Sequence, residues 1–220
     1  DAADRLWSGL LAAPAPAPAS ESPVTAAANE AATSPANDLP EPTAAQKEAG
    51  NYKKGHLQFD GLDLTIENPV GSTRTGTDGD GKPWSVEMTA HYGYHKRTKG
   101  ADGDQLDVYL AAEPKVGVPV FVVDQYNDDG SFDESKAIAG VATEAEATAI
   151  YDAHFSDGSG PRRRKAVTRM SVGQFKEWAT SERALAPAAN DKDSFVPAPD
   201  GGLDYGEITP AMSKVMRRQA

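Results

Sequence analysis

Short stretches in which hydrophobic and polar residues alternate occupy the middle of this chain. Residues 62–67 alternate with a period of two and then meet Pro69 and Gly71. Residues 84–88 alternate in the same way, and residues 77–82 hold two Asp-Gly pairs, which are typical of hairpin turns. We therefore expect a strand over 62–67 that ends in a turn, and a second strand over 84–88.

Three more segments continue this pattern. Residues 106–110 alternate, so that the two leucines and the valine face one way while Asp107 and Tyr109 face the other. Residues 118–123 form a compact apolar run, which is typical of a buried strand, and residues 136–141 follow after a turn. Several short strands at this spacing predict a mainly β fold, either a barrel or a sandwich.

Helical signals come later in the chain. Thr143 is followed three residues later by Glu146, the arrangement of a capping box, and an amphipathic stretch follows. Ser171 caps a second predicted helix, which runs to Glu182. The expected fold class is therefore mainly β, with flanking α-helices.

Composition predicts the domain boundaries. Residues 12–45 consist mainly of Ala, Pro, Ser, Thr and Glu, with almost no large apolar residue to bury. We expect residues 1–50 to be a disordered Ala/Pro-rich linker, residues 51–185 to form the folded domain, and residues 186–220 to be a C-terminal extension or linker.

Charge and cysteine content exclude several function classes. The 220 residues carry 33 acidic and 22 basic side chains, a net charge of −11, which argues against nucleic acid as a partner. No apolar run approaches the length of a membrane span. The absence of cysteine excludes disulfides, thiolate metal sites and a cysteine nucleophile.

The candidate chemistry lies in the turn that precedes residues 106–110. Asp102, Asp104 and Asp107 fall within six residues, and Tyr92-Gly93-Tyr94 begins ten residues earlier. Oxygen ligands of this kind suit Mg²⁺ or Mn²⁺, and a cation would relieve the repulsion between the three acids. A solvated Asp-Gly turn is the other interpretation, and spacing alone does not decide between them. The pattern of an EF-hand is not met, and no P-loop or Gly-x-Ser-x-Gly elbow is present.

Taken together, the Tyr-Gly-Tyr segment and the run Asp102 to Val108 resemble the signature region of the soluble family I inorganic pyrophosphatases. The variant resembles the pyrophosphatase-like domain of polyvalent proteins in phages and conjugative elements. Such proteins join enzymatic modules by low-complexity linkers, which fits the Ala/Pro-rich segment and a first residue other than methionine. The resemblance covers roughly residues 62–179 and implies an OB-like barrel with flanking helices.

By this resemblance the metal ligands are acidic residues that match the family pattern at Asp102, Asp104, Asp107, Asp128, Asp133 and Glu67. Asp104 corresponds to the aspartate beside the attacking water. Asp129 and Asp124 are alternatives to Asp128 in this assignment. The cofactor implied is Mg²⁺, with Mn²⁺ as the alternative.

The resemblance also implies which residues bind phosphate. Arg74 and Lys82 match two basic phosphate ligands, Tyr92 matches a tyrosine that contacts phosphate, and Lys136 lies near a lysine of the active site. Asp104, Tyr92 and Lys136 are accordingly the expected catalytic residues.

Two positions depart from the family pattern. Gln105 stands where the family has proline, and His154-Phe155-Ser156 occupies the place of a late Tyr-Lys pair. The basic run Arg162 to Lys165 is either a replacement for that positive charge or a solvated basic loop, and contact with nucleic acid is a weaker third interpretation.

The function that the resemblance implies is Mg²⁺-dependent hydrolysis of pyrophosphate, or of a related diphosphate, in the cytoplasm of a bacterial host. The alternative is a catalytically degenerate module that binds phosphate or metal within a larger multidomain phage or mobile-element protein. The expected partners are a small diphosphate-containing molecule and covalently linked neighbouring domains.

Overall fold

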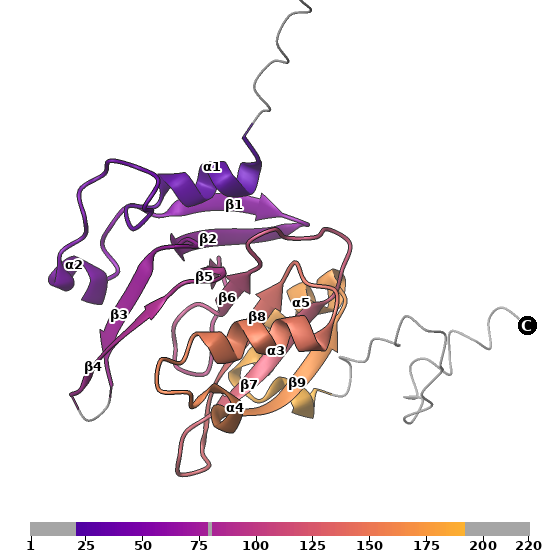
Figure 1. Ribbon diagram of the computed structural model, residues 1–220. Helices are drawn as coiled ribbons and strands as arrows, with labels where there is room; N and C mark the ends of the chain where they lie inside the picture. The colour runs from indigo at the N-terminus through magenta and orange to yellow at the C-terminus, as the bar shows by residue number, and fades with distance from the viewer. Residues whose placement is uncertain (1–20, 79–80, 192–220) are drawn as a thin grey trace, which may run out of the picture.

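A seven-stranded mixed sheet forms the centre of the molecule (Figure 1). The computed structural model describes residues 21–78 and 81–191. Within these residues the strands follow the order β1 (Gly55–Phe59), β2 (Leu62–Asn68), β5 (His91–His95), β6 (Asp107–Leu110), β8 (Phe132–Ala139), β7 (Val120–Tyr126) and β9 (Arg164–Met170). All neighbouring strands are antiparallel except β6 and β8, which run parallel. A separate hairpin, β3 (Thr73–Thr77) and β4 (Pro83–Glu87), projects from one end of the sheet.

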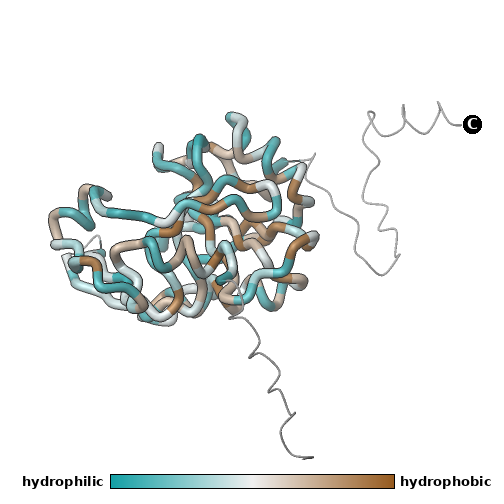
Figure 2. The backbone as a smooth tube through the Cα atoms, turned by 90° about the horizontal axis from the view of Figure 1, so that it is seen from above, coloured by the Kyte–Doolittle hydropathy of each residue, from teal (hydrophilic) through white to brown (hydrophobic). Residues whose placement is uncertain are grey.

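Both faces of the sheet are covered by apolar cores, because side chains alternate along each strand. In β7, Val120 and Val122 enter one core while Phe121 and Val123 enter the other. The first core lies under the helices α1 (Pro23–Glu30) and α5 (Val172–Ala179) and the short helices η1 (Glu182–Leu185) and η2 (Ala188–Asn190). The second core lies between the sheet, α3 (Glu144–Ala153) and β4. Segments rich in hydrophobic residues accordingly run through the interior, and many of the loops outside are hydrophilic (Figure 2).

The mainly β fold with flanking helices is confirmed. Strands form over the stretches expected from alternation, and Leu106, Val108 and Leu110 enter one core while Tyr109 enters the other. Thr143 and Ser171 both cap helices, as predicted, and Ser171 also forms a capping box with Gln174. The second of these helices is shorter than expected and ends at Ala179. Among the described residues β1 and β9 do not pair with each other, so the sheet is not a closed barrel.

The expectation of a disordered linker is wrong for residues 21–50. Here α1 packs on β1, α2 (Ala44–Glu48) follows, and Ala27, Ala28 and Ala31 are buried. Large apolar residues are not needed because the contact is close: a Cβ at Gly55 would lie 1.7 Å from the carbonyl oxygen of Ala27. Residues 1–20 of the expected linker lie outside the described residues.

The fold also continues past the expected boundary at residue 185. The backbone amides of Ala188 and Ala189 donate to the Asp124 carboxylate at 2.8 and 2.9 Å, and the Ala188 side chain is fully buried. Asp124 lies in β7, the strand next to the edge strand β9, so η2 is fastened to this side of the sheet. A final apolar core residue and a buried carboxylate thus fix a segment that looks like linker in sequence. The remainder of the expected extension, residues 192–220, lies outside the described residues.

Candidate functional site

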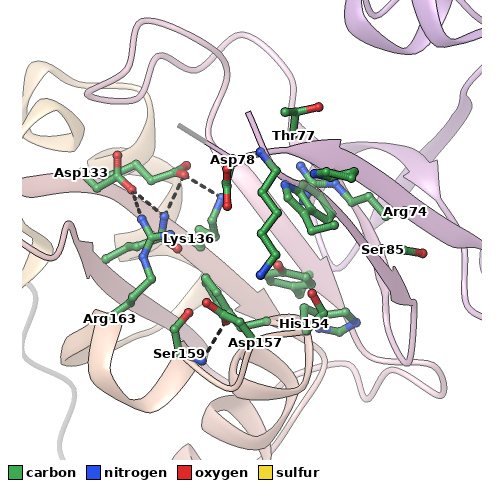
Figure 3. Close-up of a pocket in the computed structure, with 18 residues that line it drawn as sticks. Arg74, Thr77, Asp78, Ser85, Asp133, Lys136, His154, Asp157, Ser159 and Arg163 are labelled. Carbon is green, nitrogen blue, oxygen red and sulfur yellow. Dashed lines mark hydrogen bonds and ion pairs between the residues drawn. The ribbon is translucent and has the colours of Figure 1, made fainter. Parts of the chain in front are cut away.

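A cavity of about 610 Å³ opens between the β3–β4 hairpin, the sheet and the loop after α3 (Figure 3). The hairpin supplies one wall, strands β6, β7 and β8 supply the floor, and the α3–α4 region supplies the remaining wall. Its lining includes both cationic and anionic side chains, namely Arg74, Lys82, Lys136, Arg163, Asp78, Asp133, Glu134 and Asp157. A cavity with this mixture suits a phosphate-rich anion that arrives with a cation.

Strand register places a lysine beside an aspartate at the floor of this cavity. Val108 of β6 pairs with Ala137 of the parallel strand β8, so the preceding residues Asp107 and Lys136 lie side by side. Lys136 Nζ is 2.5 Å from Asp107 Oδ2 and 2.8 Å from Glu134 Oε1. The ammonium group therefore bridges two carboxylates.

Tyr92 connects this pair to the hairpin. Its hydroxyl donates to Asp107 Oδ2 at 2.5 Å and accepts a hydrogen bond from Arg74 Nη2 at 3.2 Å. The Arg74 guanidinium lies 4.3 Å from the centroid of the Tyr92 ring and 5.1 Å from that of Trp84. Stacking against two aromatic rings holds the charge in place without a carboxylate partner among the described residues.

Gln125 extends the network in the other direction. Its Nε2 donates to Glu134 Oε1 at 3.2 Å and to Asp133 Oδ2 at 2.8 Å, while its Oε1 accepts from the Tyr151 hydroxyl at 2.8 Å. Asp133 in turn accepts from Arg163 Nη2 at 2.8 Å. The side chains therefore form one continuous network across the floor, which we call the polar chain: Arg163, Asp133, Gln125, Glu134, Lys136, Asp107, Tyr92 and Arg74.

Burial and neighbouring charges fix the protonation states in the middle of the polar chain. Burial alone would raise the pKa of Asp107, but the charge and hydrogen bond of Lys136 outweigh it and hold that pKa below its ordinary value. Burial would likewise lower the pKa of Lys136, yet Asp107 and other neighbours hold it well above its usual range. Burial raises the pKa of Glu134; Lys136 opposes this shift, and the negative charges of Asp107 and Asp102 add to it. Lys136 thus stays a cation, on a side of the cavity that is rich in acids.

The model of one protein family, Inorganic Pyrophosphatase, matches residues 44–180, which is more than half of the chain. The chain belongs to the inorganic pyrophosphatase family. The match runs from α2 to the residue after α5 and includes every strand and the whole cavity. It confirms the family inferred from the Tyr-Gly-Tyr and aspartate motifs and starts earlier than the resemblance seen in the sequence. A search of curated proteins gave no match. No helix of the described residues is long and apolar enough to cross a membrane.

The expected phosphate-binding residues lie together. Arg74, Lys82 and Lys136 line the cavity, and Tyr92 lies directly behind its floor between Arg74 and Asp107. Gly93 makes this position possible, because a Cβ there would lie 1.8 Å from the carbonyl oxygen of Thr65 on the neighbouring strand.

The expected metal ligands are divided among several places. Asp133 lines the cavity and Asp107 belongs to the polar chain. Asp102 and Asp104 lie in an exposed turn, where the Asp104 amide donates to Asp102 Oδ1 at 3.1 Å. This Asx turn corresponds to the solvated Asp-Gly turn that was the other interpretation of the sequence. The negative charge of Asp102 nevertheless contributes to raising the pKa of Glu134.

The two remaining expected ligands are engaged in ion pairs elsewhere. Glu67 lies 2.5 Å from Lys54 Nζ, and that ammonium also lies over the rings of Tyr52 and Tyr94. Asp128 is exposed and pairs with Arg162. Neither carboxylate lines the cavity.

In donor chemistry the acids of the site fit a divalent cation. Carboxylate oxygens are the ligands that Mg²⁺ prefers. Burial raises the pKa of Glu134, the charge of Lys136 opposes this shift, and the charges of Asp107 and Asp102 add to it. Within residues 21–78 and 81–191, however, no three acidic or histidine side chains lie close enough together to hold a metal ion. The Lys136 ammonium lies between the carboxylates of Asp107 and Glu134, and the Asp133 carboxylate is paired with Arg163.

Sequence motifs do not reveal several residues of the site. Gln125, Glu134 and Tyr151 belong to no motif, and their roles depend on the register of β7 against β8 and on the packing of α3. Arg163 is part of the basic run that has three interpretations from the sequence, and it lines the cavity. His154, in the segment where the resemblance expects a late Tyr-Lys pair, stacks on Tyr109 with a centroid distance of 4.7 Å.

Proposed function

We propose that this member of the family hydrolyses inorganic pyrophosphate, or a related diphosphate, in a reaction that depends on Mg²⁺. The observation that carries the proposal is the polar chain, in which three cations and three carboxylates lie along one cavity. Such an arrangement offers positive charge to phosphate oxygens and carboxylate oxygen to a cation within the same space.

Arg74, Lys82 and Lys136 would contact the phosphate oxygens, because they are the expected phosphate ligands that line the cavity. Asp107 keeps Lys136 charged and in place at 2.5 Å, and Tyr92 holds Asp107 and Arg74 relative to each other. Phosphoryl transfer depends mainly on position and electrostatic stabilisation, and these side chains are fixed before the substrate arrives.

Asp102, Asp104, Asp107 and Asp133 are the residues that would hold Mg²⁺, with Mn²⁺ as an alternative ion and Glu67 and Asp128 as further expected ligands. When bound, Mg²⁺ would neutralise phosphate oxygens and make a water molecule more acidic. By the family pattern Asp104 would lie beside that water and accept its proton.

Release of inorganic phosphate from pyrophosphate tests this function. The wild type should release phosphate with Mg²⁺ and stop when a chelator removes the ion. Asp107→Asn and Lys136→Met should each lower kcat at least ~100-fold, the usual cost of a lost electrostatic group. Lys176→Gln, on the exposed face of α5, is the matched control and should keep wild-type activity. No release by the wild type, at any Mg²⁺ concentration, would refute the hydrolase.

A phosphate-binding module without turnover is the second candidate, and two observations favour it. The acids of the site are engaged in ion pairs and hydrogen bonds, and His154 with Phe155 occupies the place of the late Tyr-Lys pair. In this case the protein would be a module of a larger phage or mobile-element protein in a bacterial host, joined to neighbouring domains. Binding of a diphosphate analogue with no phosphate release from pyrophosphate would distinguish it from the enzyme.

A further inference from the structure

Arg163 is the cation at the far end of the polar chain from Arg74. It is the last residue of the short helix α4 (Gly160–Arg163), directly before β9, and its side chain lies on the same side of the cavity as Asp133 and Lys136 (Figure 3). The guanidinium lies 5.6 Å from the centroid of the Phe155 ring, which forms part of the cavity wall.

A buried network holds this guanidinium. Asp133, which accepts from Arg163 Nη2 at 2.8 Å, is itself fixed by Gln125 at 2.8 Å, and Tyr151 fixes Gln125. Gln125 is 4% exposed and Tyr151 is 0% exposed, so the support comes from inside the second core. Arg163 Nε also approaches the backbone oxygen of Tyr126 at 3.4 Å. Side chains held by buried hydrogen-bonded neighbours in this way are typical of binding sites rather than of solvated surface arginines.

The neighbouring basic residues lie differently. Arg162 is exposed and pairs with Asp128, Arg164 pairs with Asp152 at 3.0 Å, and Lys165 is exposed. Of these four residues, Arg163 alone lines the cavity. In the described residues Nη2 donates to Asp133 and Asn127, Nε donates to the Tyr126 backbone oxygen, and Nη1 has no partner, so that the Nη1 group is left for a ligand.

We propose that Arg163 binds the second phosphoryl group of the substrate, opposite the group bound by Arg74 and Lys136. Nη1 offers charge-assisted N–H donors to phosphate oxygen, while Nη2 and Nε hold the guanidinium on the protein. Arg163 thereby takes the place of the positive charge that the His154-Phe155 segment lacks, and the site selects a diphosphate over a monophosphate because cations lie at both ends. This inference rests on the proposed function and deepens it.

Binding of imidodiphosphate, a non-hydrolysable diphosphate, tests the proposal independently of turnover. Titration calorimetry with Mg²⁺ would compare the wild type, Arg163→Gln, Arg163→Lys and the charge-matched control Lys165→Gln. We expect Arg163→Gln to weaken binding about 10- to 100-fold, the loss of a charge-assisted hydrogen bond. Arg163→Lys should recover part of the affinity, and Lys165→Gln should stay within about twofold of the wild type. Inorganic phosphate is the second ligand, and its affinity should fall less than that of imidodiphosphate.

The outcomes separate this proposal from the hydrolase. If wild type and Arg163→Gln bind imidodiphosphate equally, the role of Arg163 is refuted, whatever the phosphate-release assay shows. If Arg163→Gln binds weakly and the wild type does not release phosphate, the binding role stands and the hydrolase fails. Loss of binding accompanied by a lower melting temperature in Arg163→Gln, without recovery in Arg163→Lys at the same melting temperature, would show a structural role and overturn the proposal. A wild type that does not bind the analogue refutes both.

Discussion

At the scale of single residues, Gln125 connects the two halves of the polar chain through its side-chain amide. Its amide group donates to Glu134 and Asp133 and accepts from Tyr151, so only one orientation of the amide satisfies all three partners. Carboxylates accept and do not donate, which leaves the tyrosine hydroxyl as the group that the amide oxygen needs. The two ends of the polar chain are therefore held in place by a neutral side chain.

Tyr151→Phe should destabilise the protein by about 1 kcal/mol or more, because it leaves the buried amide oxygen of Gln125 without a donor. Urea unfolding followed by circular dichroism measures this change. Tyr126→Phe is the control, since that side chain is partly exposed, and it should unfold within about 0.5 kcal/mol of the wild type. Equal midpoints for Tyr151→Phe and the wild type would contradict the role of this hydroxyl.

Sequence predicts the residues of this site only where a motif marks them. Arg74, Lys82, Tyr92 and Lys136 follow from the family pattern, and the structure brings them together at one cavity. Gln125 and Tyr151 could not be predicted, because their function comes from neighbours that are distant in sequence. The metal ligands stay a prediction, since no three acidic or histidine side chains among the described residues lie close enough together to hold a metal ion.

At the scale of elements, the close approach of α1 to β1 decides where the fold begins. Period-two alternation predicts strands such as β2 and β4 with nearly correct bounds. It does not reveal that an Ala-rich helix covers β1, because alanine gives little hydrophobic signal. The small size of alanine side chains gives them a weak hydrophobic signal in the sequence. The same small size lets the backbones of α1 and β1 approach each other closely.

Gly55→Ala should displace α1, since the new Cβ would lie 1.7 Å from the carbonyl oxygen of Ala27, a backbone atom that cannot move alone. We expect a loss of about 1–3 kcal/mol in unfolding free energy, the usual cost of overpacking. Gly173→Ala, in α5, is the control: its Cβ would meet only Ser171 Oγ at 4.0 Å, and alanine favours the helix. Chemical denaturation of both variants checks the difference. A Gly55→Ala protein as stable as Gly173→Ala would mean that α1 does not pack here.

At the scale of the whole molecule, three buried histidines make stability depend on pH. Burial lowers the pKa values of His91, His95 and His154, and each is less than a tenth exposed. The unfolded chain takes up protons below about pH 6.5, while the folded protein keeps these rings neutral to lower pH. Because the unfolded state then binds more protons, the stabilisation present above pH 6.5 is lost as pH falls towards the lowered folded values.

The free energy of unfolding should therefore fall between pH 7 and pH 5.5, by up to ~1.4 kcal/mol per pH unit for each histidine that stays neutral in the fold. Urea unfolding at four pH values in this range measures the slope. In His95→Gln one titrating group is removed, so the slope should be smaller than in the wild type. An unchanged slope would show that His95 does not contribute. The acidic groups titrate equally in both proteins and cancel in the comparison.

The fastening of η2 to Asp124 sets a lower limit on the length of chain that can fold. Asp124 is 1% exposed, and besides the Ser135 hydroxyl its partners are the backbone amides of Ala188 and Ala189. Removing those two amides would leave a charge in the sheet with one partner, which is far more costly than losing the same area of apolar contact. The docking of η2 on the sheet thus depends on the solvation of a single carboxylate. In a segment whose composition is typical of a linker, the backbone amides of Ala188 and Ala189 replace water as the hydrogen-bond donors to the Asp124 carboxylate.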